Sequence, residues 1–89
     1  MPFEPLSDAK RWGLLIRDHR QNQLFMTQSD FAARVREFAT AAGADVVIDQ
    51  STVSRWESGS VPSLRVRPFI AAACGMAPSV LFQRTEVAA

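Results

Sequence analysis

One short segment limits most strongly what this chain can fold into: Asp49-Gln-Ser-Thr-Val-Ser-Arg-Trp-Glu-Ser-Gly59. Asp49 can cap a helix by accepting hydrogen bonds from free backbone N–H groups. Gly59 can adopt the left-handed conformation that ends a helix. Val53 and Trp56 fall on one face at helical spacing. The segment therefore predicts a short amphipathic helix over 49–58 whose apolar face rests on a core.

The other faces of this predicted helix carry side chains that can read DNA. Glutamine can form two hydrogen bonds with adenine, and arginine can form two with guanine, in the major groove. The alternative interpretation is a solvated polar face on an ordinary helix, and these eleven residues alone do not decide between the two. The candidate base-reading residues are Gln50, Ser51 and Arg55, supported at the groove wall by Thr52 and Ser54.

Four runs along the chain occur in an order typical of one family: Thr27-Gln-Ser-Asp-Phe-Ala-Ala33, Ser51 to Gly59, Pro62-Ser-Leu64 and Gly75 to Phe82. Over roughly residues 10 to 82 the chain resembles the lambda-repressor-like helix-turn-helix family, also called the XRE or Cro/repressor family. The resemblance implies an all-α fold, a compact bundle of about five helices whose third helix lies in the major groove. It also implies binding to a double-stranded DNA operator by a Cro-like transcriptional repressor of a bacterium or bacteriophage.

Caps and apolar spacing predict where the helices lie within one domain of 89 residues. We expect an arm over 1–6, a helical bundle over 7–84 and a tail over 85–89. Besides the helix over 49–58, the predicted helices run from Ser7 or Asp8 to about Gln23, from Thr27 to Ala42 and from Ala77 to near Arg84. A further helix is predicted to be capped by Ser63, to begin with an irregular turn that brings Pro68 close to its first regular position, and to stop at Gly75.

The connection between the second and third helices departs from the family pattern. A helix-turn-helix normally has a turn of about three to four residues. Here Gly43-Ala-Asp-Val-Val-Ile48 stands between the helical pattern and Asp49. We therefore expect an extended second helix, a longer turn or both. At least one of the three β-branched residues Val46, Val47 and Ile48 should lie in the core. For Arg34 and Arg36, which lie on this helix, the first expectation is exposure to solvent, and the second is contact with DNA phosphates.

The resemblance also implies how the third helix is fixed and how phosphates are held. Glu57, beside the core residue Trp56, is expected to pair with an arginine of the first helix: Arg20 or, as the alternative, Arg17. Between Arg20 and Thr27 the chain has one residue more than the usual spacing. The candidate phosphate contacts offer an amide, a hydroxyl, a backbone N–H group or a guanidinium, and they are Gln28, Ser58, Gly59, Ser60, Arg65 and Arg67.

The formal net charge is only +1, whereas a strongly basic domain is the usual footprint of a nucleic-acid-binding protein. Nine of the ten basic residues are arginine, which suits forked contacts to guanine and phosphate. We therefore expect the positive charge that binds DNA to be local.

Several function classes are not expected. One histidine, His19, and one cysteine, Cys74, offer no nucleophile–base pair and no metal-ligand set. No glycine-rich phosphate loop is present, so the sequence predicts no enzyme, no cofactor, no metal and no small-molecule ligand. Neither a signal-peptide pattern nor a membrane-spanning run occurs, so a cytoplasmic location is expected.

Two questions about partners stay open in the sequence. The same fold can serve an antitoxin or adaptor whose main partner is another protein, with residues 43–48 and the Val80-Leu81-Phe82 end as the contact surface. Members of the family commonly bind two-fold operators as dimers. A homodimer is therefore one expectation, and a monomer on an asymmetric site is the other.

Overall fold

The first two long helices begin where the sequence places their caps, in a computed structural model that describes residues 7–84. Helix α1 (Asp8–Asp18) follows Ser7, whose hydroxyl accepts a hydrogen bond of 3.2 Å from the Lys10 backbone N–H. Helix α2 (Gln28–Ala41) follows Thr27, whose hydroxyl accepts from the Asp30 N–H at 3.1 Å. Both caps satisfy a backbone donor that has no partner within its helix.

A π-helical turn, η1 (His19–Gln23), continues α1 without a break. The backbone N–H of Leu24 donates to the His19 carbonyl, and that of Met26 donates to the Arg20 carbonyl, each at 2.9 Å. A π turn holds more residues than an α turn. It therefore accommodates the additional residue between Arg20 and Thr27 without displacing either from its helix end.

Helix α3 (Gln50–Glu57) confirms the predicted short helix. Asp49 accepts hydrogen bonds of 2.9 Å from both the backbone N–H and the hydroxyl of Thr52. These bonds, the backbone one first, lower the pKa of the Asp49 carboxyl. Gly59, at φ 108°, ends the helix in a backbone conformation that glycine adopts without steric cost.

The fourth and fifth helices differ from their predicted limits. Helix α4 (Arg67–Cys74) has Val66 at its N-cap, so Ser63 is not the cap that the sequence predicted. The irregular turn before the helix, the place of Pro68 in its first turn and its end at Gly75 are as predicted. A helix starting at Ser63 would need an N–H from Pro68, which proline lacks. Helix α5 (Pro78–Leu81) ends before the predicted limit near Arg84.

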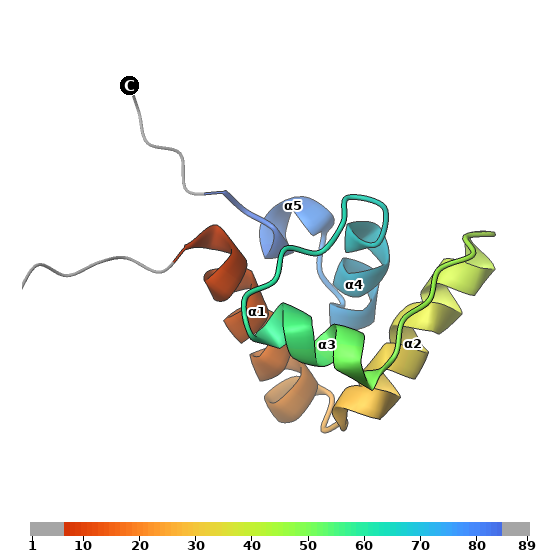
Figure 1. The fold of residues 1–89 in the computed structure, drawn as a ribbon, viewed down its shortest axis with the longest axis horizontal. Coiled ribbons are helices and arrows are strands. Elements are labelled where there is room, and N and C mark those ends of the chain that lie inside the picture. The colour runs from red at the N-terminus through yellow and green to blue at the C-terminus, as the bar shows by residue number, and fades with distance from the viewer. Residues whose placement is uncertain (1–6, 85–89) are drawn as a thin grey trace, which may run out of the picture.

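Within the described residues, five α-helices surround one apolar core, with α3 lying across α1 and α2 and with α4 and α5 behind it (Figure 1). Trp12 of α1 meets the Phe82 ring edge-to-face at 5.4 Å between centroids, a favourable geometry for aromatic pairs. No strand occurs among residues 7–84, so the all-α class is confirmed. The largest fully buried side chains are Phe31, Ile16, Ile48, Ile70, Leu81, Val35, Val53 and Pro62.

The connection from α2 to α3 is long, as predicted, because residues 42–49 lie between the two helices. After Gly43 the chain returns beside α2 without regular structure (Figure 1). Ile48 is buried in the core, whereas Val47 is 89% exposed. A guanidinium N–H of Arg36 donates to the Ile48 carbonyl and holds this segment against α2.

Candidate functional site

Helix α3 separates its side chains as the sequence predicts. Val53 and Trp56 are buried, with 0% and 5% of their surface exposed. Gln50, Ser51 and Arg55 are exposed. The half-buried Thr52 and Ser54 lie between these two groups, and the Thr52 hydroxyl takes part in the cap with Asp49. The helix therefore rests on the core by one face and presents a polar face to solvent.

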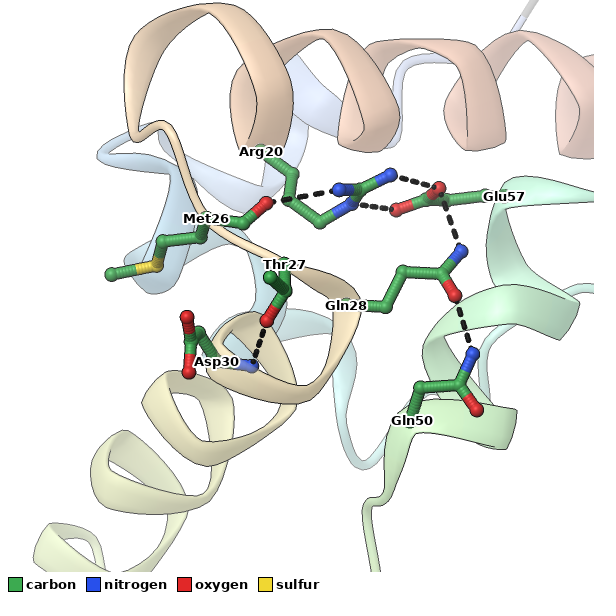
Figure 2. Close-up of polar contacts among 7 residues, drawn as sticks. All are labelled: Arg20, Met26, Thr27, Gln28, Asp30, Gln50 and Glu57. Atoms are coloured by element: carbon green, nitrogen blue, oxygen red, sulfur yellow. Dashed lines mark hydrogen bonds and ion pairs between the residues drawn. The ribbon is translucent and has the colours of Figure 1, made fainter.

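An ion pair joins the C-terminal end of α3 to the π turn after α1 (Figure 2). Arg20 donates from Nε to Glu57 Oε2 at 2.6 Å and from Nη2 to Glu57 Oε1 at 2.9 Å. Its third donor, Nη1, reaches the Met26 carbonyl at 2.9 Å. The Arg20 and Glu57 side chains are only 9% and 6% exposed, and the hydrogen bonds with Glu57 raise the pKa of Arg20. Of the two alternatives, Arg20 is thus the partner of Glu57.

Two glutamines extend this ion pair to the first residue of α3 (Figure 2). The Gln28 amide nitrogen donates to Glu57 Oε1 at 3.2 Å, and the Gln50 amide nitrogen donates to Gln28 Oε1 at 2.5 Å. We call Arg20, Glu57, Gln28 and Gln50 the clamp. It links the π turn, the start of α2 and both ends of α3.

The chemistry of the clamp fixes which way each amide points. An ionised carboxylate can only accept hydrogen bonds. Both oxygens of the Glu57 carboxylate accept from Arg20, so Gln28 turns its NH₂ group toward Glu57 and its oxygen toward Gln50. Gln50 must then use an N–H inward. Its amide oxygen and second N–H remain for a ligand in front of α3.

The Arg55 guanidinium makes a long hydrogen bond of 3.5 Å from Nη2 to the Thr52 hydroxyl, and, after the hydrogen bonds from Thr52, its charge contributes to lowering the pKa of Asp49. Among the predicted phosphate contacts, Ser58, Ser60 and Arg65 are exposed and Gly59 is half-buried. The side chain of Lys10 lies against Gly59, where an added Cβ would come within 3.0 Å of Lys10 Cγ. The sequence carried no signal for Lys10 at this place, because it depends on how the start of α1 packs against the end of α3.

The structure gives Arg67 a packing role. Its guanidinium lies 5.0 Å from the centroid of the Trp12 ring and 5.6 Å from that of Phe82, and Nε donates to the Pro62 carbonyl at 3.0 Å. Cation–π contact of this kind favours a desolvated guanidinium. Arg67 is therefore engaged in packing in this structure, and its predicted phosphate contact stays a prediction.

Arginine side chains in this fold commonly donate to backbone carbonyls that face another segment. Arg34, expected to be mainly solvated, donates to the Ala73 carbonyl of α4 at 2.8 Å and lies over the Phe38 ring. Guanidinium groups thus tie segments together rather than form one basic surface. The arginines bonded to carbonyls are Arg11, Arg20, Arg34, Arg36 and Arg67.

Residues 7–84 contain no group of three or more His, Cys, Asp or Glu side chains placed to hold a metal ion. His19 is half-buried. Cys74 is buried, and burial raises the pKa of its thiol to about 12. The same residues contain no helix with the length and apolar character that crossing a bilayer requires.

Over residues 7–84, fold and site together define a compact all-α arrangement of five α-helices in which a buried ion pair holds an exposed polar helix. A family model described as SP15 N-terminal domain matches residues 20–77. The match covers more than half of the chain, so the chain belongs to the SP15 N-terminal domain family. All four residues of the clamp lie within the matched region. The comparisons with curated proteins and with solved structures gave no match.

Proposed function

We propose that the chain binds double-stranded DNA sequence-specifically and regulates transcription, as a Cro-like repressor with a lambda-repressor-like helix-turn-helix formed by α2 and α3. The observation that carries the proposal is the clamp, which holds the exposed Gln50 at the start of α3 by one N–H and leaves its amide oxygen and second N–H for a ligand. In this proposal α3 enters the major groove, and the N-terminal end of α2 lies against the sugar–phosphate backbone.

Gln50 keeps one acceptor and one donor for a ligand, which is the pair that adenine requires. Its amide oxygen can accept from adenine N6, and its remaining N–H can donate to N7. Fixing a side chain on binding costs about 0.5–1.5 kcal/mol. The hydrogen bond between Gln50 and Gln28 already restrains Gln50 in the protein without DNA, so less side-chain freedom is lost on binding.

The other contacts follow from exposure and charge. Arg55 is free enough to reach guanine O6 and N7, with Ser51, Thr52 and Ser54 beside it at the groove wall. The remaining N–H of Gln28 is directed to a phosphate. Further phosphate contacts come from groups around the C-terminal end of α3 and the loop that follows it: Ser58, Gly59, Ser60, Arg65 and Lys10.

The long connection between α2 and α3 departs from the usual tight turn. The two helices are nevertheless joined side chain to side chain where it matters for binding, because Gln28 and Gln50 are the first residues of α2 and α3. In the proposal this hydrogen bond, rather than a short turn, fixes the N-terminal ends of α2 and α3 relative to each other.

A selection of bound sequences from random duplex DNA tests the proposal. A palindrome would indicate a homodimer, and one short asymmetric site would indicate a monomer. Failure to enrich any sequence would refute it and would favour the alternative, an antitoxin or adaptor with a protein partner. The setting we propose is the cytoplasm of a bacterium, or of the host if a bacteriophage encodes the chain.

Two arginine variants separate base reading from phosphate binding at the selected site. Arg55→Ala should cost about 1–3 kcal/mol and relax specificity at one position, whereas Arg65→Ala should weaken all sequences alike and reduce the salt slope by about one. Titrations at several salt concentrations measure both quantities. Wild-type affinity in Arg55→Ala would remove that residue from the base-reading set.

A further inference from the structure

Phe25, in the loop between η1 and α2, combines two unfavourable features. Its backbone is in the left-handed region, at φ 53°, and it is the only non-glycine residue in the described part of the chain with a positive φ. Its side chain is 83% exposed. A left-handed backbone costs a bulky L-residue free energy, and an exposed ring gains little from burial in return.

The loop holds Phe25 in this conformation from both sides. The N–H of Leu24 is bonded to the His19 carbonyl, and Leu24 packs against the core. The N–H of Met26 is bonded to the Arg20 carbonyl, and the Met26 carbonyl accepts from the Arg20 guanidinium. The residue is thus held by the same arginine that fixes the clamp.

The position of Phe25 points to what its ring contacts. It stands two residues before Thr27, the cap of α2, and three residues before Gln28. Residues in strained conformations persist only where their surroundings enforce them, and they concentrate at functional sites. The exposed ring of Phe25 gains no burial that would offset the strain.

We propose that Phe25 contacts DNA: its ring packs against the deoxyribose beside the phosphate that Gln28 binds. This inference rests on the proposed function. A phenylalanine ring suits neither phosphate binding nor base reading, so the contact is of a third kind. The C–H face of a sugar is apolar and the same in every nucleotide. The contact therefore adds affinity without sequence preference and without releasing counterions, so it leaves the salt dependence unchanged.

The test uses two variants whose residues tolerate a left-handed backbone, Phe25→Asn and Phe25→Gly. Both should fold with a Tm equal to or above that of the wild type, because the strain is relieved. Both should bind the selected site and an unrelated duplex about tenfold more weakly, with the slope of log K against log salt unchanged. Phe25→Tyr keeps the ring and should bind like the wild type. So should Val80→Ser, which removes an exposed apolar side chain from α5.

Each other result is decisive. Wild-type affinity in both Phe25→Asn and Phe25→Gly would overturn the inference and leave the proposed function standing. A loss confined to the selected sequence would overturn the sugar contact, since a sugar carries no sequence information. A changed salt slope would overturn the apolar nature of the contact. If the wild type bound no duplex at all, the proposed function would fail together with the inference.

Discussion

Gly13, in the middle of α1, allows a sharp test of how closely α1 and α3 approach. A Cβ at this position would lie closer to the Trp56 carbonyl oxygen than real Cβ atoms come, and 3.0 Å from the carbonyl oxygen of Glu57. Both neighbours are backbone atoms, which cannot rotate away. Gly13→Ala therefore requires α1 and α3 to separate by several tenths of an ångström or more.

The expected magnitude comes from two opposed effects. Alanine favours a helix interior over glycine by about 0.5–1 kcal/mol, whereas overpacking a core typically costs about 1–3 kcal/mol. Because the clash involves rigid backbone, we expect the upper part of that range and a net loss of about 1–2 kcal/mol. For a domain of this size that loss lowers Tm by about 4–16 °C.

Urea and thermal unfolding, followed by circular dichroism, measure the effect. Gly43→Ala is the matched control, since Gly43 has a positive φ but no atom within 4 Å of an added Cβ. It should lose about 1–2 kcal/mol from backbone strain alone and leave DNA binding intact. Gly13→Ala should in addition weaken DNA binding, because Glu57 is displaced with the end of α3. A Gly13→Ala protein as stable as the wild type would refute the close approach.

Three further predictions concern the ionisable groups. Glu57→Gln leaves a buried guanidinium without its counter-charge, so it should cost about 3 kcal/mol in urea unfolding and reduce discrimination for adenine; unchanged stability would refute the burial of the pair. The raised pKa of Cys74, about 12, should keep its thiol unreactive toward iodoacetamide at pH 8 until urea unfolds the chain, and rapid labelling of the folded protein would contradict this. Because folding lowers the pKa of Asp49, its contribution to stability is present above the unfolded value of about 3.9 and is lost as pH falls through the folded pKa. Asp49→Asn should therefore show a weaker acid dependence below about pH 4, and identical acid unfolding curves would argue against the cap.

Local signals predicted the helix starts well. Ser7, Thr27 and Asp49 cap helices because a short polar side chain satisfies an adjacent backbone N–H, and that interaction needs no tertiary context. The cap of α4 is the exception, because Ser63 lies three residues before the actual N-cap, Val66. The constraint from Pro68, which cannot donate the hydrogen bond that a regular helix from Ser63 would need, does predict the first regular turn.

Contacts between distant segments were harder to foresee. The resemblance indicated the pairing of Glu57 with Arg20, but the relay through Gln28 to Gln50 depends on where two helix ends meet in space. The inward turn of Arg67 likewise requires the rings of Trp12 and Phe82 to be close. For close helix approach a signal did exist, since glycine inside a helical pattern often marks one.

The guanidinium groups bonded to backbone carbonyls have a consequence for how the protein tolerates substitution by lysine. A guanidinium is planar and presents its N–H donors in a rigid fork, whereas an ammonium group is a compact charge at the end of a flexible stem. The links from Arg34 to α4 and from Arg36 to the returning segment therefore use donors whose directions the group itself fixes. Replacing these arginines with lysine would keep the charge but lose that fixed direction, so the neighbouring segments would be held less firmly.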